Sequence, residues 1–460
     1  MIMKKASETH RREFLLKISR AAALAASTPI LNTNARAASR HVWPSAGTES
    51  DRSLRNLRAQ FPLLKEPVHG RPLVYLDSAA TTQRPRTVLA AMADFYAHEN
   101  ANPARTLHSL ARRSAAQYDR AREAVARFIN AAGPEEVVFT RGTTEAINLV
   151  ARSWGEASLR AGDEVLLTVG EHYSNLVPWQ LVARRANAAL RILDIEDDGH
   201  LRLDQLETLL SERTKLVGLT HVSNVLGLVN PVRQIFDRAH RAGALVLVDG
   251  AQSVPHFAVD VQELGCDFFA FSGHKMFGPM GIGVLWSRRE ILEKMPPFQA
   301  GSNMVHDVDL ETDSLHFGDA ALKFEAGTPN VPGAVGLAAA IEFMDSLDRK
   351  VLWDREQELT RYALSKFERV KGMRILGPKQ AKERVSVFSF ALEKRDPLDV
   401  VRALDAAGIA VRGGDLASRP LLKRLGLNTA VRASCYVYTS FEEIDRLVAE
   451  LQRIVRGSSA

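Results

Sequence analysis

Short apolar runs alternate with longer amphipathic stretches along most of the chain after residue 52. Five of the runs are bounded by Gly, Asp or Ser and predict strands at residues 163–169, 214–222, 244–249, 267–272 and 281–287. Helical patterns separate them, as in "LVPWQLVARRANA" and "PVRQIFDRAHRAGA". Near-continuous apolar strands that alternate with helices predict an α/β fold with a mainly parallel, mixed sheet covered by helices.

The pattern changes beyond residue 335, where a long helical stretch, "GAVGLAAAIEFMDSL", is followed by three short apolar runs. These are "VSVFSFAL", "GIAVRGG" and "VRASCYVYT", and a helix, "SFEEIDRLVAELQRIV", closes the chain. We therefore predict a large domain at residues 52–334 and a smaller α+β C-terminal domain at 335–460.

The first 37 residues have the composition of a signal peptide. The pair Arg11-Arg12 precedes the apolar run "AAALAASTPIL", and "ARA" at 35–37 provides a cleavage site. Adjacent arginines resemble a twin-arginine signal, which predicts use of the twin-arginine export machinery and a periplasmic or exported mature protein. The alternative is a basic, amphipathic first helix. A polar linker follows at residues 38–51.

Charge and composition narrow the possible functions. The whole chain has a net charge of +6, and residues 1–37 contribute +5 of it, so the remainder does not have the charge of a nucleic-acid-binding protein. After the signal, the sequence shows no apolar run long enough for a membrane anchor. The two cysteines provide no disulfide framework, and no Cys/His cluster has the spacing of a zinc site.

Four polar positions follow predicted strands and together suit one cofactor. Lys275 lies in a glycine-bounded turn, "FSGHKMFGP", and Asp249 ends the apolar run "ALVLVD". Thr143 begins a helix after Gly142, where free backbone N–H groups bind phosphate, and His172 follows a third strand. Each feature alone is common in proteins. Together they provide a Schiff-base lysine, a partner for a pyridinium nitrogen, a phosphate site and a stacking ring, as pyridoxal 5′-phosphate requires.

The chain resembles the class V aminotransferase family of fold type I, and within it the class II cysteine desulfurase and selenocysteine lyase branch. The motifs that carry the resemblance are "YLDSAATTQRP", "TRGTTEAIN", "EHYSNLVPWQ", "HVSNVLGLVNPV", "LVDGAQSVPH", "FSGHKMFGPMGIGVL", "FEAGTPN" and "VRASCYVYT". They cover nearly all of the chain after the signal and follow the order of the family.

This resemblance implies roles for individual residues. Lys275 would form the Schiff base and act in catalysis, Asp249 would keep the pyridine nitrogen protonated, and His172 would stack on the ring. The implied contacts to the phenolic oxygen are Asn224 and Gln252, and those to the phosphate are Thr143, Ser272 and His274. The resemblance also implies Arg432 for the substrate carboxylate, with Arg412 as a second substrate-binding candidate, and a homodimer in which Thr328 reaches the partner's phosphate.

The sequence departs from the family at the substrate end. Class II desulfurases carry a nucleophilic cysteine where this chain has Ala417, and Asp415 and Leu416 replace two histidines. Ala104 stands where a pocket histidine is usual. Cys435 is a poor substitute, because side chains alternate along a strand and Cys435 then points away from the face that carries Arg432.

The surviving chemistry begins with removal of the α-proton by Lys275. From there β-elimination and transamination are the leading outcomes, since a good leaving group departs without a thiolate. The motifs do not separate a lyase from a transferase. An amino-acid epimerase of the same family and a degenerate cofactor-binding partner protein remain as alternatives.

Overall fold

The computed structural model describes residues 54–103 and 107–457. The predicted signal peptide, the linker and Ala104 lie outside the described residues, so those interpretations stay predictions. Within the described ranges no helix is long and apolar enough to cross a membrane.

Seven strands form the large sheet, in the order β4-β10-β9-β8-β7-β5-β6. Their bounds are β4 Val137–Thr140, β5 Glu164–Thr168, β6 Ala189–Leu193, β7 Thr214–Thr220, β8 Leu245–Asp249, β9 Phe268–Ser272 and β10 Gly283–Ser287. β10 runs antiparallel to both of its neighbours, and the other pairings are parallel. The mainly parallel, mixed sheet is confirmed, and all five strands predicted for this region are present.

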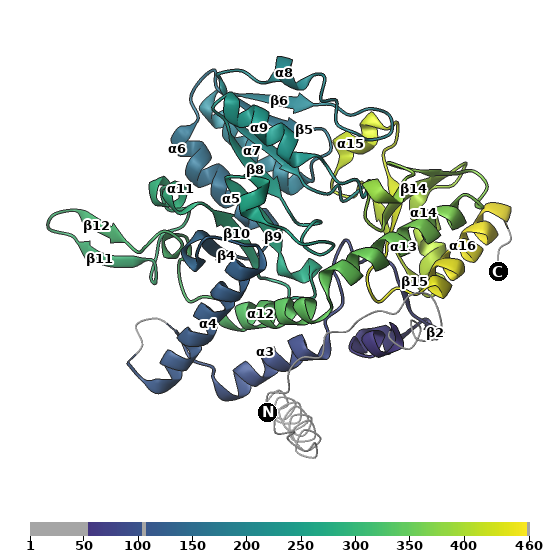
Figure 1. Ribbon diagram of the computed structural model, residues 1–460, viewed down its shortest axis with the longest axis horizontal. Helices are drawn as coiled ribbons and strands as arrows, with labels where there is room; N and C mark the ends of the chain where they lie inside the picture. Colours follow the sequence, from purple (N-terminus) through teal and green to yellow (C-terminus); the bar gives the residue numbers. More distant parts are fainter. Residues whose placement is uncertain (1–53, 104–106, 458–460) are drawn as a thin grey trace, which may run out of the picture. The chain divides into compact units, whose positions relative to one another are not determined.

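Helices cover both faces of the sheet because alternate side chains of each strand enter two separate cores. In β8, Val246 and Val248 belong to one core and Leu247 to the other. The first core includes α4 (Ser109–Phe128), α9 (Val232–Arg241) and α12 (Val331–Ser346), and the second includes α5 (Thr143–Val150), α7 (Tyr173–Ala186) and α11 (Arg289–Lys294). Figure 1 shows α12 beside α4 and α3 (Arg86–His98).

A second sheet lies in the C-terminal part. It has the order β13-β14-β17-β16, with every pairing antiparallel. The bounds are β13 Met373–Ile375, β14 Val387–Leu392, β16 Arg412–Gly414 and β17 Ala430–Ser434. Its core includes residues of α13 (Arg349–Phe367), α14 (Pro397–Ala406) and α16 (Phe441–Arg456). The α+β character of this region is as predicted.

The N-terminal segment pairs with the C-terminal part of the chain. β3 (Val74–Tyr75) pairs in parallel with β15 (Ile409–Ala410), and Asp77 forms a bridge with Ser434. Helix α12 contributes its apolar side chains to the core beneath the large sheet. The proposed division into domains at residue 334 stays a prediction, since chain segments cross between the two parts.

Several elements differ from the sequence expectations. The hairpin of β11 (Val305–Asp309) and β12 (Ser314–Phe317) was not expected, because its side chains are largely exposed and mostly polar, and β6 was not expected although its five residues, "ALRIL", are mostly apolar. The strand predicted over "VRASCYVYT" ends at Ser434. The Cys435 N–H still donates to the carbonyl of Ser386, and the chain turns after it, where the Thr439 N–H donates to the carbonyl of Tyr436.

Candidate active site

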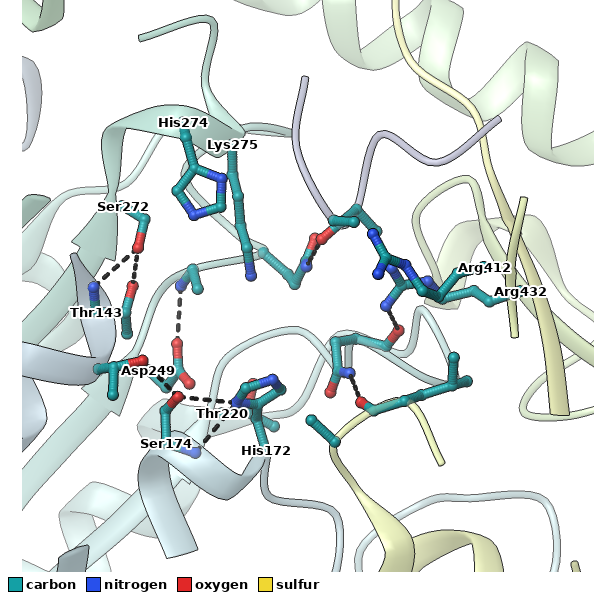
Figure 2. Close-up of a pocket in the computed structure, with 18 of the residues that line it drawn as sticks. Thr143, His172, Ser174, Thr220, Asp249, Ser272, His274, Lys275, Arg412 and Arg432 are labelled. Atoms are coloured by element: carbon teal, nitrogen blue, oxygen red, sulfur yellow. Dashed lines mark hydrogen bonds between the residues drawn. The ribbon is translucent and has the colours of Figure 1, made fainter. Parts of the chain in front are cut away.

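A cavity of about 480 Å³ lies at the carboxyl ends of the parallel strands. β5, β7, β8 and β9 end at this edge, and so does β4, which is why residues far apart in the sequence meet there. The cavity brings together every predicted site residue except Thr328, namely Thr143, His172, Asn224, Asp249, Gln252, Ser272, His274, Lys275, Arg412 and Arg432. All of these except Asn224 and Gln252 are labelled in Figure 2.

Hydroxyl groups gather at one end of the cavity, at the start of α5. The Ser272 hydroxyl lies 2.7 Å from the Thr143 hydroxyl and accepts a 2.8 Å hydrogen bond from the Thr143 N–H. Gly283 allows β10 to approach this turn, because a Cβ there would lie 2.4 Å from the Cα of Gly142. Hydroxyls and a helix N-terminus together form a site suited to a phosphate.

Lys275 projects into the middle of the cavity from the turn after β9 (Figure 2). Burial, with a further effect from Arg432, lowers the pKa of Lys275 to about 8, and Asp249 opposes this shift. Burial raises the pKa of Asp249, whose Oδ1 accepts a 2.9 Å hydrogen bond from the Ala251 N–H. A lysine with a lowered pKa in a cavity is a candidate nucleophile and base.

His172 immediately precedes α7 and lines the same cavity as Lys275. Its Nδ1 accepts a 3.1 Å hydrogen bond from the Ser174 N–H and lies 3.0 Å from the Ser174 hydroxyl. Nδ1 is therefore an acceptor. Burial, followed by the charges of Lys275 and Arg432, lowers the pKa of His172 to about 4, so the ring is neutral. A neutral, fixed imidazole suits stacking on an aromatic ring.

Two arginines form the opposite end of the cavity. Both contact Asp77: Nη2 of Arg412 lies 2.8 Å from Oδ2, and Nη2 of Arg432 lies 3.4 Å from Oδ1. Arg432 is buried and also donates to the carbonyl of Asn224 at 3.1 Å, whereas the side chain of Arg412 is 49% exposed. Burial lowers the pKa of Arg432, which makes a bound carboxylate favourable there.

Several buried polar atoms in the cavity walls have no hydrogen-bond partner in the part of the chain that the structure describes. A cofactor that fits this cavity should provide partners for them. These atoms are Oε1 of Gln252, Nδ1 of His274 and Nε of Arg432. Within residues 54–103 and 107–457, Nζ of Lys275 likewise makes no hydrogen bond or ion pair. Buried polar groups need partners. A ring with a phosphate, a basic nitrogen, an oxygen and an aldehyde provides partners for Gln252, His274 and Lys275, so these three residues fit pyridoxal 5′-phosphate, and Nε of Arg432 remains available for a substrate carboxylate. Among the described residues, no group of three or more His, Cys, Asp or Glu side chains is arranged to hold a metal ion.

No thiol lines the cavity. Ala417 lies in its wall, beside Asp415 and Leu416. Cys435 and Cys266 are buried in separate apolar clusters, and burial raises the pKa of both thiols. The interpretation of Cys435 as a packing residue agrees with its position.

Thr328 lies away from this cavity. It is exposed, and its hydroxyl accepts a 3.2 Å hydrogen bond from Asn102. Its predicted contact involves a partner subunit, so its role stays a prediction.

Several residues around the cavity were missed by the sequence reasoning: Asp77, Glu171, Tyr173, Ser174 and Thr220. Glu171 is fully buried and accepts from Thr168 and Asn175, and burial raises its pKa to about 7. Asp77, Glu171 and Tyr173 stand within quoted motifs, and their positions beside predicted site residues were the available signal. Their contacts depend on the folded chain.

Comparison with known proteins identifies the family. The sequence profile described as "Aminotransferase class-V" matches residues 74–447. The chain belongs to this family. The family consists of pyridoxal-phosphate-dependent enzymes and includes cysteine desulfurases, as the resemblance implied.

Curated relatives carry the name cysteine desulfurase. One from Synechococcus elongatus is 48% identical over 407 residues, which cover 88% of this chain and 64% of the relative. A probable cysteine desulfurase from Halalkalibacterium halodurans is 47% identical over 397 residues, covering 86% of this chain and 97% of the relative. The matched part of this chain thus covers less than two thirds of the first relative and almost all of the second.

A solved structure supports the same fold. The cysteine desulfurase CsdA from Escherichia coli superposes with a TM-score of 0.81 at 37% identity, covering 88% of this chain and 99% of that protein. The fold-type-I architecture predicted from the sequence is therefore confirmed.

Proposed function

We propose that this protein binds pyridoxal 5′-phosphate and removes the α-proton of an amino acid, and that it then releases a β-substituent. The observation that carries the proposal is the position of Lys275, a half-buried amine between a hydroxyl-lined end and an arginine end of one cavity. The relatives named cysteine desulfurase support the choice of a β-lyase.

The cofactor, when bound, supplies an electron sink for the charge that develops at the substrate's Cα. Asp249 provides a negative charge for the pyridine nitrogen, and His172 covers the ring. Thr143 and Ser272 bind the phosphate. Arg432 binds the substrate carboxylate with two parallel N–H donors, which orients the α-proton toward Lys275.

The leaving group must depart without a thiolate, because Ala417 occupies the wall where the family's cysteine would stand. A sulfinate group can leave as sulfur dioxide with its bonding electron pair kept on Cβ, so that cysteine sulfinate and water give alanine and sulfite, with Lys275 moving the proton. A selenide would instead leave with the electron pair, and selenocysteine and water would then give selenide, pyruvate and ammonium. We expect L-cysteine to bind through Arg432 but to be a very poor source of sulfide.

An amino-acid panel tests this function. The cofactor-loaded protein is incubated with L-cysteine sulfinate, L-selenocysteine and L-cysteine, each with reductant where sulfide or selenide is measured. We expect equal amounts of alanine and sulfite from the sulfinate and almost no sulfide from cysteine. Keto acid in place of alanine from the sulfinate would indicate a transaminase, and racemised substrate would indicate an epimerase. No turnover of any substrate would favour a cofactor-binding partner protein.

The Ala417→Cys variant is the matched control. We expect it to gain little sulfide release from L-cysteine, because the Asp415 carboxylate lies in the same wall and disfavours a thiolate. Robust desulfuration by this variant would show that the thiol alone was missing and would leave the sulfinate preference without support.

We also propose that the protein is exported through the twin-arginine machinery and cleaved after Ala37. The support is the order of Arg11-Arg12, the apolar run and "ARA" in the sequence. Cell fractionation of the native host and sequencing of the mature N-terminus test this. A protein that remains in the cytoplasm and begins near Met1 would contradict it.

We propose further that the active form is a homodimer in which Thr328 contacts the phosphate bound by its partner. The exposed position of Thr328, outside the cavity of its own chain, supports this. Light scattering measures the oligomer, and Thr328→Ala should weaken cofactor binding. A monomer with full cofactor affinity would contradict the proposal.

A further inference from the structure

The segment Asp415–Ser418, here called the 415–418 loop, connects β16 to α15 (Arg419–Arg424) and forms one wall of the cavity. It is fixed to α7 by two hydrogen bonds to a single residue. The Tyr173 hydroxyl donates to Oδ2 of Asp415 at 2.8 Å, and the Tyr173 N–H donates to the carbonyl of Ala417 at 2.8 Å. Both bonds join segments that are more than 200 residues apart in the sequence.

The opposite side of the loop is held by Asn224. Its Nδ2 donates to the carbonyl of Leu416 at 2.9 Å, and its Oδ1 accepts from the Ser418 hydroxyl at 3.2 Å. Leu416 also buries its side chain in the core beneath the large sheet. The loop is therefore held on one side by Tyr173 and on the other side by Asn224.

This attachment maintains an unfavourable backbone. Leu416 and Ala417 have φ angles of +52° and +53°, in the left-handed region that residues with a Cβ adopt at a cost. Asp415 compensates from within the loop, since its Oδ1 accepts a 3.0 Å hydrogen bond from the Ala417 N–H. One carboxylate thus stabilises both the loop conformation and its contact with Tyr173.

We propose that Asp415 is a positioning residue: through Tyr173 and the Ala417 N–H it latches the 415–418 loop to the helix that carries His172, so that the substrate end of the cavity is formed before substrate binds. Tyr173 directly follows His172, so the latch also fixes the start of α7 at the stacking histidine. Its effect on substrate recognition rests on the proposed function, whereas the latch itself rests on the contacts.

The Asp415→Asn variant separates the contribution of the hydrogen bonds from the contribution of the negative charge. The asparagine side-chain oxygen can accept from the Ala417 N–H, and its NH₂ can donate to the Tyr173 hydroxyl, which accepts as readily as it donates. Asp415→Asn therefore keeps the latch and removes the charge. Asp415→Ala removes both bonds, and Tyr173→Phe removes only the hydroxyl bond.

Amide hydrogen exchange on the full-length, cofactor-loaded protein reads the latch directly, because the N–H groups of Tyr173 and Ala417 are both donors in it. Loss of a hydrogen bond to a carboxylate in Asp415→Ala should speed exchange at these two amides about tenfold. Tyr173→Phe should have a smaller effect, about threefold at residue 173. Asp415→Asn should stay within about twofold of the unmodified protein.

Tyr362→Phe is the matched control. It removes a tyrosine–aspartate hydrogen bond of the same 2.8 Å length, to Asp445, between α13 and α16. It should leave exchange at residues 173 and 417 unchanged. A change as large as in Tyr173→Phe would mean that any such loss loosens the protein generally, and it would overturn the proposal.

Kinetics test the consequence for substrate. Asp415→Ala should raise KM about tenfold for the substrate that the panel identifies, with a smaller change in kcat, and Asp415→Asn should restore it. Unchanged exchange in Asp415→Ala, or an equal loss in Asp415→Asn, would overturn the latch. If no substrate is turned over, the proposed function fails on its own, while the exchange data still decide the latch.

Discussion

The hydroxyl end and the substrate end of the cavity are built in different ways. At the hydroxyl end, Ser272 ends β9 and Thr143 begins the helix after β4, and two hydrogen bonds connect the two residues. At the substrate end, Asp77 lies between two arginines, and the 415–418 loop contacts α7 and Asn224. Strand ends thus supply the hydroxyl end, and contacts between distant segments supply the substrate end.

The difference bears on which end of the cavity is the more constrained by the fold. The residues of the hydroxyl end lie at the ends of buried strands of the large sheet. The 415–418 loop can change with local compensation, as the Asp415 hydrogen bonds show. We therefore expect variants at the centre of the cavity to abolish activity and variants at the substrate end to alter selectivity.

The largest effect is expected for Lys275→Ala. It removes the base at the centre of the cavity, and turnover should fall by about 10³-fold or more. The hydroxyl end is separate, so the variant should still bind the cofactor noncovalently. Turnover and bound cofactor are measured together, and borohydride should attach the cofactor to the peptide containing Lys275 in the unmodified protein only. A variant with near-normal turnover would contradict the assignment of the lysine.

Arg432→Ala should have the next largest effect and act on binding. Removing the buried guanidinium leaves the substrate carboxylate unpaired, at a cost of about 2–5 kcal/mol in the binding free energy. Spectral titration with an amino acid measures the loss. Arg412→Ala should cost much less, because its side chain is 49% exposed and already paired with Asp77. Equal losses in the two variants would show that the exposed arginine is the principal carboxylate ligand.

The rate at which Lys275 forms a Schiff base with added cofactor should rise about tenfold per pH unit below pH 8. Burial, with Arg432, lowers the pKa of Lys275 to about 8, and the ammonium form has no lone pair for the aldehyde. The rate of capture by cofactor-free protein should therefore rise up to about pH 8 and then level off. Arg432→Ala removes one cause of the lowered pKa and should move the plateau to higher pH. A rate that climbs steadily toward pH 10 in the unmodified protein would contradict this.

The sequence predicted the hydroxyl end and the centre of the cavity better than it predicted the substrate end. Lys275, Asp249, Thr143 and His172 each follow an apolar strand, and strand ends in a parallel sheet meet at one edge. The Tyr173–Asp415 contact spans 242 residues and has no comparable local signal. The end of β17 at Ser434 was also unpredicted, since apolar residues continue beyond it and the turn is shown only by hydrogen bonds between Tyr436 and Thr439.

That early strand end leads to the smallest predicted effect, in Cys435→Ala. The argument from alternating faces required the strand to continue through residue 435, which it does not, yet the side chain is 2% exposed and lies in the C-terminal apolar core. Burial raises the pKa of its thiol, so it stays protonated and is a weak nucleophile. We expect turnover of the preferred substrate, and the trace release of sulfide from L-cysteine, to change less than about twofold, because cysteine to alanine is a small change in a buried position. Sulfide release that disappears in this variant would instead make Cys435 the thiol that the cavity lacks.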